Sequence, residues 1–156
     1  MTLDRSPASA PPLELPSTDG STFNLAQERG APLVIYFYPK DNTPGCTTEA
    51  AQFRDLYPAF RKAGASIYGI SRDSLRSHAA FKEKMALQFE LLCDADEIAC
   101  QAWTVIKMKN MYGKQVRGIE RSTFVIGADG TILKEWRGVK VPGHVEEVLA
   151  FVQTLA

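Results

Sequence analysis

The sequence has few cysteines, no apolar run long enough to cross a membrane, and no recognisable export signal. Its 156 residues include three cysteines and no C-x-x-C pair, which argues against a disulfide scaffold and a zinc site. No apolar segment approaches the roughly 20 residues that a transmembrane helix needs. The first residues, MTLDRSP, lack the apolar core of a signal peptide. We therefore expect a cytoplasmic protein whose thiols stay reduced.

The chain also lacks an excess of charge of either sign. Eighteen Lys and Arg residues balance eighteen Asp and Glu residues, so no net field favours nucleic acid or an anionic membrane as a partner. The two histidines, His78 and His144, have no partner at metal-ligand spacing. No glycine-rich phosphate loop stands out. We therefore expect no metal, no organic cofactor, and no binding to nucleic acid or membrane.

Length and composition indicate a single domain. A hydrophobic content of 45% and a charged content of 23% are typical of a soluble globular protein, and 156 residues suffice for one sizeable core. Residues 1–12 carry three of the nine prolines together with Ser, Thr and Ala, which predicts a flexible lead-in. Residues 13–156 are then the folded domain.

Strand and helix patterns alternate along this domain. An Asp19-Gly20 turn predicts a hairpin between residues 13–16 and 22–25. The segments that follow are a buried strand at 33–37, a helix from Cys46 to about 63, a strand at 65–70, a helix at 75–85, a strand at 89–93 and a helix at about 94–103. Within the first helix, Pro58 predicts a kink or a break near Tyr57.

The C-terminal third is less regular. Residues 104–117 predict an irregular segment with a turn at 110–113. A second hairpin is predicted from strands 122–126 and 131–136, and Pro142-Gly143 precedes a last helix. This order favours an α/β protein with a central mixed sheet, helices on both faces and an N-terminal β-hairpin, which a thioredoxin-like fold satisfies.

One cysteine lies where a buried strand gives way to a helix. The apolar run Leu33–Phe37 precedes Cys46, and residues 49–56 after it have helical spacing. Unpaired backbone N–H groups and the helix dipole at such a position favour the thiolate, which is the nucleophilic form of cysteine. Cys46 is therefore the candidate nucleophile.

Two motifs of the chain resemble those of one enzyme family. The spacing Pro39-x-x-x-Thr43-x-x-Cys46 is similar to the active-site signature of the peroxiredoxins, and the run TPGCT resembles their bacterioferritin-comigratory, or peroxiredoxin Q, branch. The segment GIERSTF, which contains Arg121, resembles the part in which the family keeps its active-site arginine. The resemblance extends from about residue 13 to the C-terminus. It implies a thioredoxin-like fold and thiol-dependent reduction of hydrogen peroxide and organic hydroperoxides.

Three residues carry the expected chemistry. A thiolate attacks one peroxide oxygen, the O–O bond breaks, and the sulfur leaves as a sulfenic acid, with Cys46 as the nucleophile. Arg121 supplies a permanent cation that favours the thiolate and contacts the peroxide. Thr43 lies one helical turn before Cys46, so we expect its hydroxyl to hydrogen-bond the sulfur and the peroxide.

Further residues are expected to support this site. Pro39 lacks an N–H and restricts its loop, so we expect it to shield the thiolate from water. The backbone N–H groups of Gly45 and Cys46 are additional hydrogen-bond donors. The resemblance implies that Glu49, one turn beyond Cys46, orients Arg121.

The regeneration step departs from the pattern of many relatives. The resemblance implies a second, resolving cysteine five residues after Cys46 or in the helix near residues 81–83, but Ala51 occupies the first position and the second region has no cysteine. This predicts a one-cysteine mechanism in which thioredoxin, glutaredoxin or a small thiol reduces Cys46 directly. Cys93 and Cys100 remain candidate resolvers, although burial in the core explains both more simply.

Other functions remain open on the same fold. A thiol–disulfide oxidoreductase would need an attacking pair such as C-x-x-C, where this chain has Thr43-x-x-Cys46. A peroxide sensor or chaperone would oxidise Cys46 without turnover. An atypical two-cysteine peroxidase would use Cys93 or Cys100 as its resolver. We expect the protein to be a monomer.

Overall fold

The strand β3 (Leu33–Phe37), buried along its whole length, lies at the centre of a five-stranded sheet. In the computed structural model, which describes residues 9–155, this sheet has the order β5 (Glu90–Cys93), β4 (Ser66–Ser71), β3, β8 (Ser122–Ile126), β9 (Ile132–Arg137). β3 pairs parallel with β4 and antiparallel with β8. The predicted mixed sheet is therefore confirmed.

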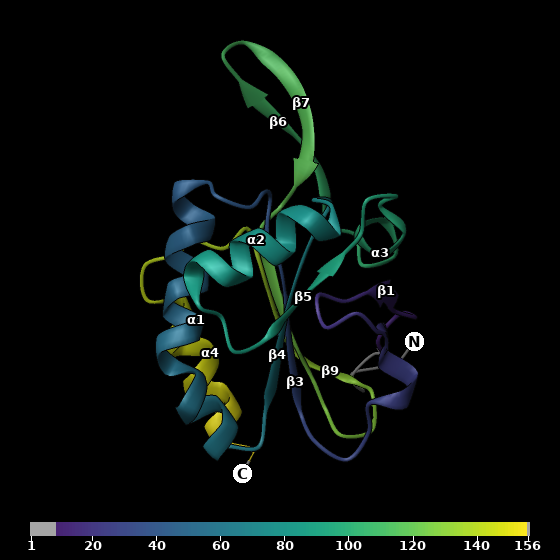
Figure 1. The fold of residues 1–156 in the computed structure, drawn as a ribbon, viewed down its shortest axis with the longest axis vertical. Helices are drawn as coiled ribbons and strands as arrows, with labels where there is room; N and C mark the ends of the chain where they lie inside the picture. The colour runs from purple at the N-terminus through teal and green to yellow at the C-terminus, as the bar shows by residue number, and fades with distance from the viewer. Residues whose placement is uncertain (1–8, 156) are drawn as a thin grey trace, which may run out of the picture.

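The two faces of the sheet are covered differently (Figure 1). One face packs against the three longer helices, α1 (Pro44–Lys62), α2 (Leu75–Met85) and α4 (His144–Gln153). The other face packs against the N-terminal hairpin of β1 (Glu14–Pro16) and β2 (Thr22–Asn24), the 3-10 turn η1 (Leu25–Gln27) and the five-residue helix α3 (Ile98–Ala102). Phe53 lies in the first core and Trp103 in the second. Parallel strands need both faces covered, and this arrangement provides the cover.

Helix α1 runs through Pro58 without ending, so of the kink or break expected near Tyr57 the break is wrong and the kink stays a prediction. Proline removes the N–H that would bond the carbonyl four residues earlier, which belongs to Arg54. In the structure the Arg54 carbonyl accepts a hydrogen bond of 3.1 Å from the side-chain amide of Gln88. A partner from outside the helix thus replaces the lost bond.

For residues 104–117 the turn at 110–113 is confirmed, whereas the expectation of an irregular segment is wrong. This segment forms a regular hairpin of β6 (Ile106–Met111) and β7 (Lys114–Ile119), which pair with each other and project from one end of the domain (Figure 1). Tyr112 and Gly113 form its turn with φ of 54° and 78°. The sequence pattern misleads because half of each strand is polar and the hairpin projects from the body of the protein, where no buried face is needed.

The remaining differences are smaller. Helix α3 begins at Ile98 rather than near 94, since the side chain of Asp94 accepts hydrogen bonds from the backbone N–H groups of Ala99 and Cys100. Residues 1–8 of the expected lead-in lie outside the described residues, while the N–H of Ala10 donates to the carbonyl of Gly130 over 3.0 Å. Among residues 9–155, none of the helices has both the length and the hydropathy needed to cross a bilayer.

Candidate active site

Cys46 lies in the first turn of α1, three residues after the N-cap Thr43. Pro44 occupies a position where its missing N–H leaves no helix hydrogen bond unmade. The strand β3 ends at Phe37, and the connecting loop brings the chain back to the carboxyl edge of the parallel strands. Only 2% of Cys46 is exposed, so the sulfur is buried beneath the loop and the start of the helix rather than lying on an open surface.

Arg121 reaches this sulfur from the connection between β7 and β8. Its Nη2 donates to Cys46 Sγ over 3.4 Å, and its Nη1 donates to Glu49 Oε1 over 2.6 Å. One guanidinium therefore bridges two residues of the first turns of α1. A charge-assisted contact of this kind stabilises a thiolate relative to a thiol.

Gly45 makes this approach possible. A Cβ atom at position 45 would lie 3.0 Å from Arg121 Nη2, closer than ordinary van der Waals contact. The glycine therefore leaves the space that the guanidinium fills beside the sulfur. The expectation for Gly45 concerned its N–H group, so this steric role is one that the sequence did not reveal.

Glu49 is fully buried and holds the far end of the guanidinium. Burial raises the pKa of Glu49 to about 7, although the charge and the hydrogen bond of Arg121 oppose this effect. Its second oxygen, Oε2, has no hydrogen-bond partner among the residues that the structure describes. Glu49 therefore binds its proton more tightly than an exposed glutamate does.

Thr43 and Pro39, in the loop before Cys46 and at the start of α1, are both half-buried. The hydroxyl of Thr43 donates to the carbonyl of Lys40 over 2.9 Å, so its proton is directed at the loop rather than at the sulfur. The oxygen lone pairs of Thr43 then stay available to accept a hydrogen bond. The hydrogen bonds described for residues 9–155 include none between Thr43 and Cys46.

A second group of side chains, which the sequence did not single out, holds the loop before Cys46. Asp41 is buried, and it accepts hydrogen bonds from Tyr38 Oη at 2.7 Å and Ser77 Oγ at 2.8 Å. His78 Nδ1 lies 2.9 Å from Asp41 Oδ2, and His78 Nε2 lies 3.0 Å from the carbonyl of Leu92, which can only accept. Although burial opposes it, hydrogen bonding to His78 and Tyr38 holds the pKa of Asp41 below its ordinary value.

Helix α2 supplies most of these contacts. Lys84 Nζ donates to Asn42 Oδ1 over 3.2 Å, and the backbone N–H of Asp41 donates to Asp73 just before α2 over 2.9 Å. The loop that leads to Cys46 is thus tied to the start of α2. The strand order could have indicated this group of side chains, because residues that follow neighbouring parallel strands meet at one edge of the sheet.

Asp41, Asp73 and His78 also have side chains of the metal-binding types, and one ligand atom of each lies within 4.8 Å of the others. Their polar atoms already have protein partners, including Ser71 Oγ at 2.5 Å from Asp73 Oδ2. The residues therefore act as a hydrogen-bonded clamp, and the expectation of no metal stays a prediction.

The other two cysteines are free, as Cys46 is. Cys100 is fully buried, and burial together with Asp94 raises the pKa of its thiol well above its ordinary value. Cys93 ends β5 and is half-buried. The structure therefore joins neither residue to Cys46.

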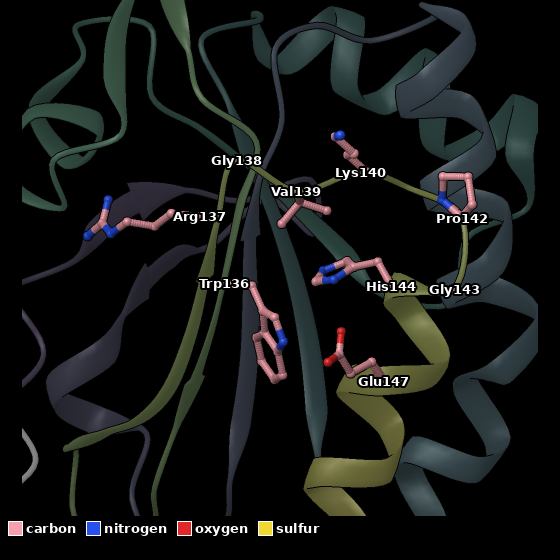
Figure 2. Close-up of a pocket in the computed structure, with 9 residues that line it drawn as sticks. All are labelled: Trp136, Arg137, Gly138, Val139, Lys140, Pro142, Gly143, His144 and Glu147. Carbon is pink, nitrogen blue, oxygen red and sulfur yellow. The ribbon is translucent and has the colours of Figure 1, made fainter.

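Two cavities lie near this end of the protein. A groove of about 360 Å³ adjoins the pocket, and its lining residues are Pro44, Gly45, Thr48, Gln52, Val141 and Pro142. A cavity of about 340 Å³ lies between β9 and the start of α4, where Figure 2 shows Trp136 and His144 facing it. Cys46 and Arg121 line neither cavity, but the groove includes Gly45, the residue directly before Cys46, so it is the one next to the sulfur.

Comparison with known proteins gives one consistent result. Residues 8–135 match the model of the AhpC/TSA family. The chain is 52% identical over 150 residues to Peroxiredoxin Bcp of Xanthomonas campestris, covering 96% of this chain and 94% of that protein, and 48% identical over 147 residues to Peroxiredoxin Bcp of Bacillus subtilis, covering 94% of each.

Solved structures agree. The structure of Xanthomonas campestris Peroxiredoxin Q is 53% identical, with a TM-score of 0.86 over 91% of this chain and 90% of that one. A second structure, of the Bacterioferritin Comigratory Protein of the same organism, is 52% identical with a TM-score of 0.86 over the same shares, and its study concerns alkyl peroxide reduction activity.

Proposed function

This chain belongs to the AhpC/TSA family as a peroxiredoxin of the Bcp type, and from that premise we propose that Cys46 is the residue that attacks the peroxide. Thiol-dependent reduction of hydroperoxides is the activity of this family. The observation that carries the assignment of Cys46 is the 3.4 Å contact from Arg121 Nη2 to its sulfur, at the start of α1. A guanidinium and a helix N-terminus together favour the thiolate.

The chemical step at Cys46 needs few groups. The thiolate forms an S–O bond with one peroxide oxygen while the O–O bond breaks, and the departing alkoxide or hydroxide takes up a proton to leave as alcohol or water. Arg121 stabilises the negative charge that moves from sulfur to the departing oxygen. Glu49 positions Arg121, and the N–H groups of Gly45 and Cys46 are further donors.

Thr43 and Pro39 act on the substrate and its surroundings. With its proton directed at the Lys40 carbonyl, the Thr43 oxygen accepts the proton of the incoming hydroperoxide and orients the O–O bond toward the sulfur. Pro39 covers the loop side of the pocket without adding an N–H group. The groove of about 360 Å³ beside Gly45, lined by Pro44, Val141 and Pro142 among others, supports organic hydroperoxides as substrates, with the alkyl group in the groove.

Regeneration of Cys46 follows a one-cysteine scheme. The buried Cys100 thiol resists ionisation, and Ala51 occupies the position of a resolving cysteine on the same helix. An external thiol, from thioredoxin, glutaredoxin or a small thiol, then reduces the sulfenic acid. We expect a cytoplasmic monomer, and the three unbridged cysteines support the reducing compartment.

The test is peptide mapping and intact mass after one equivalent of hydrogen peroxide. We expect a sulfenic acid at Cys46 without a disulfide, and a Cys93→Ser/Cys100→Ala variant that turns over peroxide at close to the wild-type rate. Cys46→Ser is the control and should abolish turnover. A disulfide between Cys46 and either remaining cysteine would replace the one-cysteine scheme by an atypical two-cysteine one. An unoxidised Cys46 would overturn the assignment itself.

A further inference from the structure

The hairpin of β6 and β7, residues 106–119, carries positive charge only. It contains Lys107, Lys109, Lys114 and Arg117 and no Asp or Glu, in a chain whose total charges balance. It projects beyond the central sheet at the end of the molecule where α1 begins (Figure 1). We call it the basic arm. A segregation of charge on this scale creates a local field that the net charge of the protein conceals.

The strand register places the lysines on one face of the basic arm. Cross-strand partners in an antiparallel pair share a face, and alternate residues along each strand return to it. The pairs on this face are Lys107–Gly118, Lys109–Val116 and Met111–Lys114. Arg117 lies on the opposite face, opposite Met108, and forms an ion pair with Glu97 beside α3. The three lysines form no ion pair within residues 9–155, and Lys107 and Lys114 are exposed to solvent.

The lysine face continues to the rim of the active site. Lys109 is half-buried, and its Nζ donates to the carbonyl of Ile119 over 2.6 Å, two residues before Arg121. Gly118 lies opposite Lys107 on the same face, and a Cβ atom built at residue 118 would lie 3.9 Å from Lys109 Cε. Burial lowers the pKa of Lys109, and the charges of Arg121 and Cys46 also act on it. The face therefore extends from the arm to the pocket of Cys46.

We propose that the lysine face of the basic arm docks the external reductant, a small acidic dithiol protein, over Cys46. The proposal rests on the one-cysteine scheme above, which requires a thiol from outside the chain to reach a nearly buried sulfur. Exposed lysines that lack carboxylate partners attract a partner with carboxylates around its own reactive thiol. The arm extends well beyond the pocket, which suits a protein surface better than a small molecule.

The docked reductant regenerates Cys46 in two successive thiolate attacks. The reductant's first thiolate attacks Sγ of the Cys46 sulfenic acid, an S–S bond forms, and hydroxide leaves as water after taking a proton. The reductant's second thiolate then attacks its own sulfur in the mixed disulfide. The S–S bond to Cys46 breaks, the Cys46 thiolate is restored, and the reductant leaves oxidised with an internal disulfide.

The experiment reverses two charges that make no described contact. Lys107→Glu/Lys114→Glu is compared with Lys62→Glu/Lys134→Glu, which makes the same change of charge at exposed positions on α1 and β9. Lys109 and Arg117 stay unchanged because their side chains are bonded to the protein. Steady-state rates are measured with reduced thioredoxin of acidic isoelectric point and, separately, with uncharged dithiothreitol.

We expect the arm variant to lose about 10- to 100-fold in kcat/KM for the acidic thioredoxin at low salt, with the loss shrinking as salt increases. Its rate with dithiothreitol and its stoichiometric oxidation by hydrogen peroxide should match those of the wild type. The control variant should lose much less kcat/KM for the acidic thioredoxin, because its charges lie away from the docking face. The logarithm of its fold-loss should be less than about a third of that of the arm variant.

Several outcomes would overturn the docking role. Equal losses in both double variants would show that net charge alone matters. Equal losses with dithiothreitol would show damage to the pocket. Unchanged kinetics accompanied by aggregation, or by lost binding to duplex DNA or anionic vesicles, would assign the lysines to solubility or to another partner. An unoxidised Cys46 in the wild type would instead refute the peroxidase assignment, and that readout uses no reductant.

Discussion

At the scale of single residues, Gly45 and Glu49 decide how the Arg121 guanidinium is held beside Cys46. Gly45 leaves the space for Nη2, and Glu49 binds Nη1 from the buried side. Neither residue needs to touch the substrate to influence the reaction. Each can be changed with a conservative substitution whose result differs from simple unfolding.

Gly45→Ala should slow the reaction of Cys46 with hydrogen peroxide by about tenfold. The added methyl group displaces Arg121 Nη2 from the sulfur, and a weakened charge-assisted hydrogen bond costs ~1.5–3 kcal/mol, where ~1.4 kcal/mol is tenfold in rate. Alanine is the better helix former, so the free energy of unfolding should not decrease. Stopped-flow oxidation and urea unfolding measure the two effects. An unchanged rate would contradict the steric role of Gly45.

Glu49→Gln should remove a pH dependence of stability. The pKa of Glu49 in the folded protein is about 7, above its ordinary value of 4.5, so the folded state binds this proton more tightly than the unfolded state. That contribution to stability is complete below about pH 4.5 and is lost as the pH rises through about 7. Relative to the variant, the free energy of unfolding of the wild type should decrease by at most about 3 kcal/mol across this pH window. Parallel urea unfolding curves at about pH 5 and about pH 8 test this, and identical pH profiles would contradict it.

At the scale of elements, α2 acts as a brace for the loop before Cys46. The Asp41–His78 pair is buried at both ends, and its neighbours Ser77 and Lys84 also bind the loop. The loop contains Thr43 and leads directly into α1. Displacement of α2 would therefore change the geometry of the pocket without touching it.

Asp41→Asn and His78→Asn should each destabilise the protein by about 3–5 kcal/mol, because each leaves a buried polar partner unpaired. The double variant should lose less than the sum, since the second change removes a group that the first had already orphaned. Urea unfolding of the wild type, the two single variants and the double variant measures this double-mutant cycle. Ser77→Ala is the matched control, and its free energy of unfolding should decrease by about 1 kcal/mol. Strict additivity in the cycle would show that the two side chains do not act as a pair.

The same scale explains two wrong expectations about elements. A proline inside a helix normally predicts a break, but Gln88 from outside α1 supplies the donor that Pro58 lacks. The polar residues of β6 and β7 predicted an irregular segment, but they form strands because each pairs with the other in the basic arm. In both cases the deciding partner lies outside the window in which a sequence pattern is read.

At the scale of the whole molecule, the protection of backbone N–H groups from hydrogen exchange should follow how completely each strand is paired and buried. β3 is paired on both sides and fully buried, whereas within the described residues β6 and β7 pair only with each other. Hydrogen exchange should therefore be slowest in β3 and fastest in the basic arm. If exchange in the basic arm is slow and becomes slower as the protein concentration rises, a second copy of the chain covers the arm. That result would contradict the monomer.

The sequence by itself determined the position of the reactive sulfur. The apolar run Leu33–Phe37, the helical pattern after Cys46 and the proline at the helix start are local features, so the strand, the loop and the helix could be predicted without tertiary contacts. The resemblance of GIERSTF to an active-site segment pointed to Arg121, but no local pattern required that side chain to reach Cys46.

Only the tertiary structure decided what surrounds the sulfur. The space left by Gly45, the burial of Glu49 and the pairing of Asp41 with His78 all depend on which distant segments lie side by side. The single face of the three lysines depends on the register of the β6–β7 hairpin. The pairing of β3 with β4 joins residues 33 positions apart, and its pairing with β8 joins residues 85 to 93 positions apart. Distances between such segments are set by sheet register and helix packing, and these are properties of the folded chain as a whole.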